Sequence, residues 1–277
     1  MRRGVALVAT AATAWGTWSL VLRPSGLPAS ATSPLLFAVM GVVTLPVALR
    51  APRASWDRGL VLLILANAAC DALNVVTFFA ALARTTVAIA VLTHYAAPIL
   101  VALAAPRVDG VIVRGSRAAA AVALVGLAIV LEPWHAPADG AIAGAALGLA
   151  SAAGYAGNVF VVRRLAVRIG PARQMAYHSL VAAVVLAPFG ASALATVSAG
   201  DAGLVAAGSA TLGAVAGVMF AAGLAQIGSA RAAVLAYAEP LVAVAVGALV
   251  WHEPLHPIAA VGGALVIAAG VHVARQS

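Results

Sequence analysis

The amino-acid sequence predicts an all-α membrane protein whose ten transmembrane helices form two five-helix repeats of inverted topology. Three observations support this prediction: ten long apolar runs, arginines that gather on alternate connections, and features of the first half that recur in the second. Of the 277 residues, 64% are hydrophobic and only 9% are charged, whereas soluble domains carry roughly 25% charged residues. So few charges cannot cover a water-exposed surface, so most of the surface is expected to face lipid.

Charged residues, Pro and Gly bound each apolar run. A transmembrane helix needs about 20 mostly apolar residues, and lipid satisfies no backbone hydrogen bonds, so runs without strand-like alternation are predicted to be helices. The first run follows Met1-Arg2-Arg3 and resembles a secretory signal, but further spans follow it, so we expect an uncleaved first span. The second and fifth are the shortest. In chain order the predicted spans are 4–22, 34–50, 59–83, 86–106, 116–132, 140–162, 171–190, 201–224, 229–251 and 257–274.

The arginines predict the orientation of these spans, because cytoplasmic loops of membrane proteins carry an excess of positive charge. With a cytoplasmic N-terminus, the outside loops hold only Arg23 and Arg84. A wrong span count would scramble this alternation, so both termini are predicted to be cytoplasmic. The inside segments hold Arg2, Arg3, Arg50, Arg53, Arg58, Arg107, Arg114, Arg117, Arg163, Arg164, Arg168, Arg173, Arg231 and Arg275.

The two halves, residues 1–135 and 136–277, resemble each other. At an offset of 142, Tyr95-Ala-Ala-Pro98 matches Tyr237-Ala-Glu-Pro240, and Phe78 matches Phe220. Near an offset of 140, Ala14-Trp15-Gly16 matches Gly154-Tyr155-Ala156. Because five is odd, the second half enters the membrane from the opposite side. Inverted repeats of this kind are typical of secondary transporters, which bind substrate near the membrane midplane between the repeats.

Several motifs resemble a known family: Ala14-Trp15-Gly16, Tyr237-Ala-Glu-Pro-Leu241, Trp251-His-Glu-Pro254 and the run from Gly262 to Gly270. Together with the five-plus-five spans, they resemble the EamA branch of the drug/metabolite transporter superfamily over nearly the whole chain. The resemblance implies export of amino acids, amines or other small metabolites across the inner membrane by alternating access. The glutamate that is common after the fourth span of the family is missing here, although Asp109 lies nearby.

Three ionisable residues lie about midway along predicted spans: Asp71, His94 and Glu239. Each costs roughly 2.5–3.5 kcal/mol to insert, so such residues usually face a bundle interior or a cavity. Asp71 belongs to a polar stripe with Asn67, Asn74 and Phe78, whose spacing places all four on one helical face. We favour a water-accessible cavity or substrate site at this stripe over a purely structural hydrogen-bond network.

Proline follows two of these residues. Pro240 and Pro98 each remove a backbone donor and free the carbonyl of the residue four positions earlier, which predicts local helix breaks. Glu239 fits a structural role as well as proton or substrate binding. His94 fits a proton acceptor as well as a packing residue. His94 and Tyr95 point about 100° apart, so only one is expected to face a given cavity.

Aromatic residues accompany the stripe. Trp15 and Tyr155 are repeat-equivalent, and Tyr155 shares a helical face with Ser151 and Asn158. These rings are predicted to line the cavity and stack on an organic cation, with plain packing as the alternative.

Other function classes are excluded or disfavoured. The formal charge is +8, but the arginines lie at span ends without an aromatic basic face, so nucleic-acid binding is not expected. The single cysteine, Cys70, excludes a disulfide. His252, Glu253 and His256 are expected to form a solvated loop rather than a metal site. Because no phosphate loop, nucleophile elbow or paired-carboxylate pattern is present, we predict neither an enzyme nor a cofactor.

The sequence therefore predicts a secondary exporter with a cavity between spans 1, 3, 4, 6, 8 and 9. Asp71 and Asn74 would bind an amine, and protonation of Asp71 or Glu239 would couple export to proton entry. Efflux of lipophilic cations and a non-transporting membrane scaffold or sensor remain alternatives, and either a monomer or a homodimer fits. The predicted substrate-binding residues are Trp15, Asp71, Asn74, Phe78, His94, Tyr95, Tyr155, Asn158, Tyr237 and Glu239.

Overall fold

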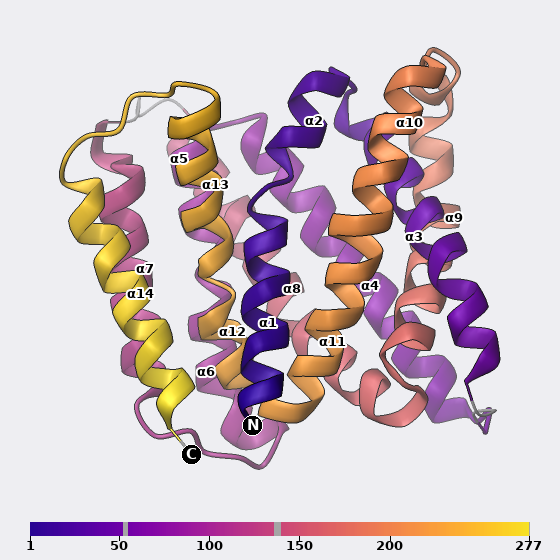
Figure 1. The fold of residues 1–277 in the computed structure, drawn as a ribbon, viewed down its shortest axis with the longest axis horizontal. Coiled ribbons are helices and arrows are strands. Elements are labelled where there is room, and N and C mark those ends of the chain that lie inside the picture. The colour runs from indigo at the N-terminus through magenta and orange to yellow at the C-terminus, as the bar shows by residue number, and fades with distance from the viewer. Residues whose placement is uncertain (52–54, 136–139, 277) are drawn as a thin grey trace.

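The computed structural model describes residues 1–51, 55–135 and 140–276, and among these residues it contains helices but no strand. The helices run between two ends of the molecule, and both termini lie at the same end (Figure 1). The α-helices are α1 (Arg2–Trp15), α2 (Ser19–Ser25), α3 (Ala29–Arg50), α4 (Arg58–Leu82), α5 (Val87–His94), α6 (Ala97–Val108), α7 (Ser116–Leu131), α8 (Ala141–Ile169), α9 (Pro171–Leu194), α10 (Ala199–Gly208), α11 (Ala216–Ile227), α12 (Ser229–Leu235), α13 (Ala238–Val250) and α14 (Ala259–Arg275). A 3-10 turn, η1, covers Pro133–His135, and a π-helical segment, η2, covers Ser209–Val215.

Eight helical segments of the described chain are long and apolar enough to cross a membrane. They coincide with the predicted spans one to four and six to nine. The predicted second span, expected to be short, is a helix of 22 residues. The predicted fifth and tenth spans are the shorter apolar helices α7 and α14, with 16 and 17 residues. The all-α class is confirmed, and the count of ten spans stays a prediction. Arg53 lies outside the described residues, and so does residue 136, the first residue of the predicted second repeat.

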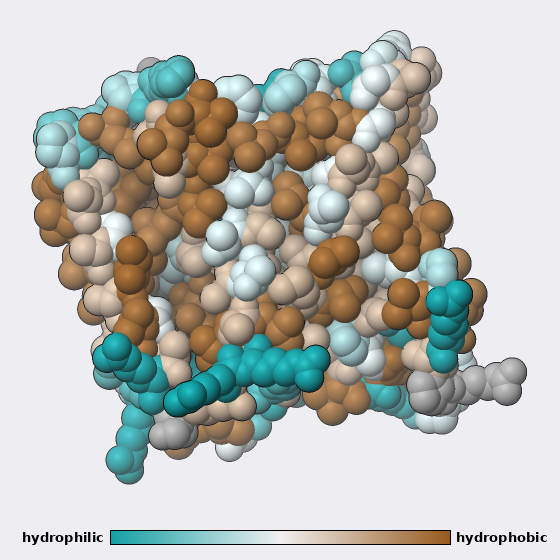
Figure 2. Space-filling view, in the orientation of Figure 1, coloured by the Kyte–Doolittle hydropathy of each residue, from teal (hydrophilic) through white to brown (hydrophobic). Residues whose placement is uncertain are grey.

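The surface matches a lipid environment. Hydrophobic residues cover much of the face between the two ends, and hydrophilic residues gather at the ends, most densely where the termini lie (Figure 2). Ile142 is 88% exposed and both Phe189 and Leu249 are 78% exposed. Large apolar side chains exposed over a wide area indicate contact with lipid rather than water. The chain is therefore a multi-pass membrane protein.

Both predicted helix breaks are confirmed. α5 ends at His94 and α6 begins at Ala97, just before Pro98. In the second half, α12 ends at Leu235 and α13 begins at Ala238, just before Pro240. Each proline removes one backbone donor and forces the preceding turn to open. Each break therefore divides one span into two shorter helices.

Ion pairs join helix ends at both ends of the molecule. Asp109, after α6, pairs with Arg163 of α8 at 3.0 Å, and it also accepts a hydrogen bond from the backbone amide of Ser229 at 3.3 Å. At the other end Glu253, after α13, pairs with Arg23 of α2. Asp109, which lacks the family pattern in sequence, therefore has a defined structural partner.

Asp57 caps α4 and supplies a first testable prediction. Leu60 N donates to Asp57 Oδ1 at 2.8 Å, and this bond, together with the Arg168 guanidinium, lowers the pKa of Asp57 from its ordinary value. A group with a lowered folded-state pKa stabilises the fold above its unfolded pKa and loses that contribution as pH falls. We expect Asp57→Ala to lower the melting temperature at neutral pH, and Asp57→Asn to lower it less because the cap survives.

Thermal unfolding in detergent at several pH values tests this prediction. The gap between wild type and Asp57→Ala should narrow below about pH 4, where the carboxylate becomes protonated. A gap that is the same at pH 7 and at low pH would show that the Asp57 charge contributes nothing.

Candidate functional site

A cavity of about 410 Å³ lies in the interior of the helix bundle. All six spans predicted to form it contribute: Trp15 and Trp18 come from span one, and side chains of α4, α5, α8, α11 and α13 line the rest. α3 and α9, the second and seventh spans, also line it, which the sequence analysis did not predict. The cavity therefore takes residues from both halves of the chain.

Eight of the ten predicted site residues line this cavity. Their convergence from five helices agrees with the predicted shared face of α4 and with the predicted inward faces of α5, α8 and α13. Whether they bind a substrate remains a prediction. The eight are Trp15, Asp71, Asn74, Phe78, His94, Tyr155, Asn158 and Glu239.

Tyr95 and Tyr237 are the two predicted site residues that lie outside the cavity lining. Both are buried in a separate apolar cluster, where their rings lie 6.0 Å apart between centroids. The Tyr237 hydroxyl donates to the Tyr95 carbonyl oxygen at 2.7 Å. His94 faces the cavity, whereas Tyr95, about 100° around the helix, faces the core. This agrees with the expectation that only one of the two would face the cavity. These tyrosines join the two helix breaks rather than flank the cavity.

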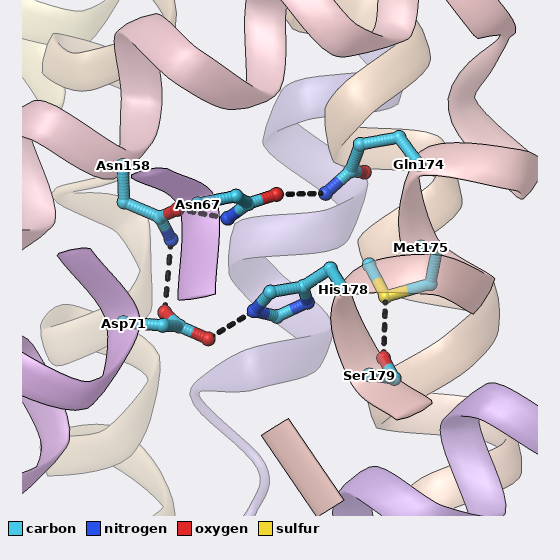
Figure 3. A network of polar contacts seen from close by, with 7 residues as sticks. All are labelled: Asn67, Asp71, Asn158, Gln174, Met175, His178 and Ser179. Carbon is cyan, nitrogen blue, oxygen red and sulfur yellow. Dashed lines mark hydrogen bonds and ion pairs between the residues drawn. The ribbon is translucent and has the colours of Figure 1, made fainter. Parts of the chain in front are cut away.

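Asp71 lies at the centre of a polar network that joins three helices (Figure 3). Its Oδ1 accepts a hydrogen bond from Asn158 Nδ2 at 2.9 Å, and its Oδ2 contacts His178 Nε2 of α9. Asn158 Oδ1 in turn accepts from Asn67 Nδ2, and Asn67 Oδ1 accepts from Gln174 Nε2 at 3.1 Å. The network holds the Asp71 carboxylate in one orientation at the cavity wall.

Asn74 belongs to a second network rather than to that of Asp71. The Ser151 hydroxyl donates to Asn74 Oδ1 at 2.7 Å, and His94 Nδ1 lies 2.8 Å from the same hydroxyl oxygen. The His94 ring also contacts Phe78 and Tyr155, with centroid distances of 4.8 and 5.4 Å. The cavity thus has one wall with Asp71 and His178 and another with His94 among aromatic rings.

Glu239 provides the second carboxyl group of the lining. It lies in the first turn of α13, after the break before Pro240, and the Tyr95 side chain forms a hydrogen bond with it. Although Tyr95 does not line the cavity, it therefore positions a residue that does. Glu239 comes from the second half of the chain and Asp71 from the first.

His178 and Gln174 are the main residues that the sequence analysis missed. Both are buried in α9, at 6% and 1% exposure. Their spacing of i and i+4 within an apolar span is the same signal that identified the stripe around Asp71. Applied to residues 171–190, it would have predicted an inward polar face on the seventh span.

Three buried polar atoms near the cavity lack a hydrogen-bond partner among the described residues: the Tyr155 hydroxyl, His178 Nδ1 and Gln174 Oε1. A buried polar group without a partner costs about 1–3 kcal/mol, so such groups are suited to meeting a ligand or water. In the described part of the chain, no group of three His, Cys, Asp or Glu side chains is arranged to hold a metal ion.

Tyr155→Phe tests whether this unpaired hydroxyl serves a ligand. The substitution removes a buried unpaired group, so we expect the melting temperature to stay equal or rise. If a substrate uses the hydroxyl, its apparent affinity should fall by about fivefold, since a neutral hydrogen bond contributes about 1 kcal/mol. A fall in thermal stability without a change in substrate affinity would assign Tyr155 to packing alone.

The model of the EamA-like transporter family matches residues 142–274. A solved structure described as "Crystal structure of protein" superposes with a TM-score of 0.80 at 19% identity, over 99% of this chain and 97% of that chain. At this identity the likeness concerns the fold alone. No curated protein matches the chain. Residues 142–274 thus match the EamA-like transporter family, which is a family of membrane transporters in the drug/metabolite superfamily.

Proposed function

We propose that this protein is a secondary active transporter that exports a small amine-like metabolite, such as an amino acid or an amine, across the inner membrane. It works by alternating access, with ten spans in two inverted five-helix repeats, residues 1–135 and 136–277. Proton entry drives the export. The observation that carries the proposal is a cavity inside the bundle that both halves of the chain line with ionisable side chains.

The pairing of helices supports the inverted repeat. The first span packs on the eighth through α1 and α11, and the third on the sixth through α4 and α8. The second packs on the seventh through α3 and α9, and the fifth on the tenth through α7 and α14. Exchanging each span with its counterpart five positions along leaves this set of pairings unchanged. Such symmetry is what an inverted-repeat transporter requires for two equivalent conformations that open to opposite faces.

Individual side chains follow the same symmetry. Tyr95 and Tyr237 are counterparts and contact each other, as residues on either side of a two-fold axis do. The ion pairs at the two ends are also related: Arg23 and Arg163 are 140 positions apart, and Asp109 and Glu253 are 144 apart. Each pair links the end of a repeat's first span to the end of the other repeat's fourth. We propose that each pair helps to close the cavity towards one face.

The chemistry of the cavity supports an amine-containing substrate. Asp71 and Glu239 are carboxyl groups, and aromatic rings of Trp15, Phe78 and Tyr155 surround the space between. A carboxylate binds an ammonium group by a charge-assisted hydrogen bond, and aromatic faces attract the same cation. The orientation, with both termini in the cytoplasm, rests on the arginine distribution and on the presence of both termini at one end (Figure 1).

Counterflow in proteoliposomes tests the proposal. Vesicles loaded with unlabelled solute are mixed with a labelled trace of the same solute, drawn from a panel of amino acids, amines and quaternary ammonium compounds, with and without a pH gradient. We expect transient accumulation of at least one amine or amino acid, enhanced by a gradient that is acidic on the side opposite the substrate. Activity that never responds to the gradient would contradict proton coupling.

Two other functions remain as defined outcomes of this experiment. Accumulation of tetraphenylphosphonium without any amino acid or small amine would indicate efflux of lipophilic cations, for which an acid among aromatic rings also serves. If no solute moves while a stable partner copurifies, the protein is a membrane scaffold or sensor. Its behaviour in solution, as monomer or homodimer, is open to measurement in the same preparation.

A further inference from the structure

We propose that His178 decides by its own protonation whether Asp71 can bind a cationic substrate, so that an ammonium group at Asp71 alternates with a proton on the imidazole of His178. This inference rests on the proposed transport function and deepens it. It arises from a residue outside the predicted site, and it identifies the cargo of the Asp71 wall as a monocation.

The contacts of Asp71 define the arrangement. Asn158 is a neutral partner at Oδ1, and His178 Nε2 contacts Oδ2. The side chain of Asp71 is 11% exposed and that of His178 is 8% exposed, and both residues line the cavity. A carboxylate has about four lone-pair sites, so two remain for a ligand approaching from the cavity.

The second nitrogen of His178 makes the imidazole a suitable switch. Nδ1 is buried and has no hydrogen-bond partner among the described residues. A proton on Nδ1 therefore has no acceptor, and its loss breaks no hydrogen bond within the protein. Nε2–H continues to donate to Asp71 in either state, because which nitrogen keeps its proton is set by the bond that nitrogen makes. The pair can change its charge without changing its geometry.

The balance of charge then determines what binds. With His178 protonated, the pair is neutral overall and has no net attraction for a cation. With His178 neutral, the pair carries one negative charge, which costs several kcal/mol within a membrane unless a cation compensates it. Binding of an ammonium group restores neutrality. Both loaded states are neutral, and either can be carried through the membrane at lower cost than the empty charged state.

The proton balance is one for one. When the substrate binds, the Nδ1–H bond of the imidazolium breaks, its electron pair stays on nitrogen, and the proton passes to water that reaches Nδ1 as the cavity opens. When the substrate leaves on the far side, water there returns a proton to Nδ1. Export of one monovalent amine is thus coupled to import of one proton through His178, while Asp71 stays ionised throughout.

The other groups that face the pair are uncharged or are held by other partners. From α4 it meets Asp71, and from α3 it meets the ring of Phe37 at a centroid distance of 5.5 Å. From α8, Asn158 reaches it only through Asp71, and Gln174, one turn earlier on α9, is uncharged. His94, Tyr155 and Glu239 line the same cavity, but His94 is held by the Ser151 network and Glu239 by Tyr95.

Binding of phenylethylamine to purified protein at several pH values tests the inference. This probe stays protonated between about pH 5.5 and 7.5, because its amine resembles that of lysine in basicity. For wild type we expect the apparent Kd to rise as the pH is lowered, by up to about tenfold per pH unit. For His178→Gln, which keeps a neutral donor, we expect tight binding at every pH and transport without a proton gradient. His178→Arg, with a permanent charge, should lose binding at least 100-fold.

The matched control is His272→Gln, because His272 lies at the exposed end of α14 and bonds only to Gln276 among the described residues. It should behave as wild type. If wild type transports phenylethylamine but His178→Gln keeps the wild-type pH dependence, the inference is overturned and the transport function stands. If His178→Gln is misfolded, the wild-type protein still tests the inference: a Kd for phenylethylamine that does not change with pH overturns it. If wild type moves no amine at all, the proposed function itself fails.

Discussion

Replacing Asp71 by Asn is expected to lower amine transport by up to about 100-fold while leaving the protein folded. The carboxylate supplies the only charge that a bound ammonium meets on the α4 wall, and a hydrogen bond to a charged group contributes up to about 3 kcal/mol, which is about 100-fold in affinity. Asparagine has the same shape and can still accept from Asn158, so the network of Figure 3 keeps most of its contacts.

The measurement is initial-rate export from proteoliposomes, with thermal unfolding as the check on folding. Asp201→Asn is the matched control, because Asp201 lies in the first turn of α10 and its described side-chain contact is with Ser198 at the exposed end. It should transport as wild type does. Unchanged transport by Asp71→Asn would remove both the substrate role and the coupling role from Asp71.

Replacing Gly154 by Leu is expected to abolish folded protein, because this glycine sets the distance between α4 and α8. A Cβ atom at Gly154 would lie 2.8 Å from the Asn74 amide nitrogen and 2.8 Å from the Cys70 carbonyl oxygen. Both are backbone atoms and cannot rotate away. The two helices would have to separate, and the hydrogen bond of Asn158 to Asp71 and that of Ser151 to Asn74 both cross this interface.

Gly203→Leu is the matched control, since a Cβ at Gly203 in α10 meets no atom within 4 Å. Leucine is also a better helix former than glycine by roughly 0.8 kcal/mol. Gel filtration of the two detergent extracts should give a single sharp peak for Gly203→Leu and aggregate for Gly154→Leu. A sharp, thermally stable peak for Gly154→Leu would show that α4 and α8 tolerate separation.

Much of this arrangement could be predicted from the sequence because the membrane restricts the solutions. Long apolar runs must be helices there, and ionisable residues such as Asp71 and Glu239 must turn inward. The breaks at Pro98 and Pro240 follow from local chemistry alone. The start of α3 at Ala29 and the end of α8 at Ile169 could not be derived this way, because helix ends depend on caps and loops that hydropathy does not resolve.

The partners of each polar residue could not be predicted, since pairing depends on how helices rotate against one another. The polar stripe of α4 indicated an inward face, but not that Asp71 meets His178 while Asn74 meets Ser151. Tyr95 and Tyr237 matched each other in sequence, which suggested a shared site. Their symmetry places them against each other in the core instead.

The central claim, that one cavity opens in turn to both faces of the membrane, is tested most directly by labelling a cysteine placed at Phe78, in a Cys70→Ser background, with a membrane-impermeant thiol reagent applied from either side of oriented vesicles. Phe78 lines the cavity, whereas Leu73→Cys on the same helix, at a position 46% exposed towards lipid, provides the unreactive control. The proposal predicts labelling at position 78 from both faces, with substrate changing the ratio of the two rates. Labelling from one face only, whatever substrate is present, would contradict it.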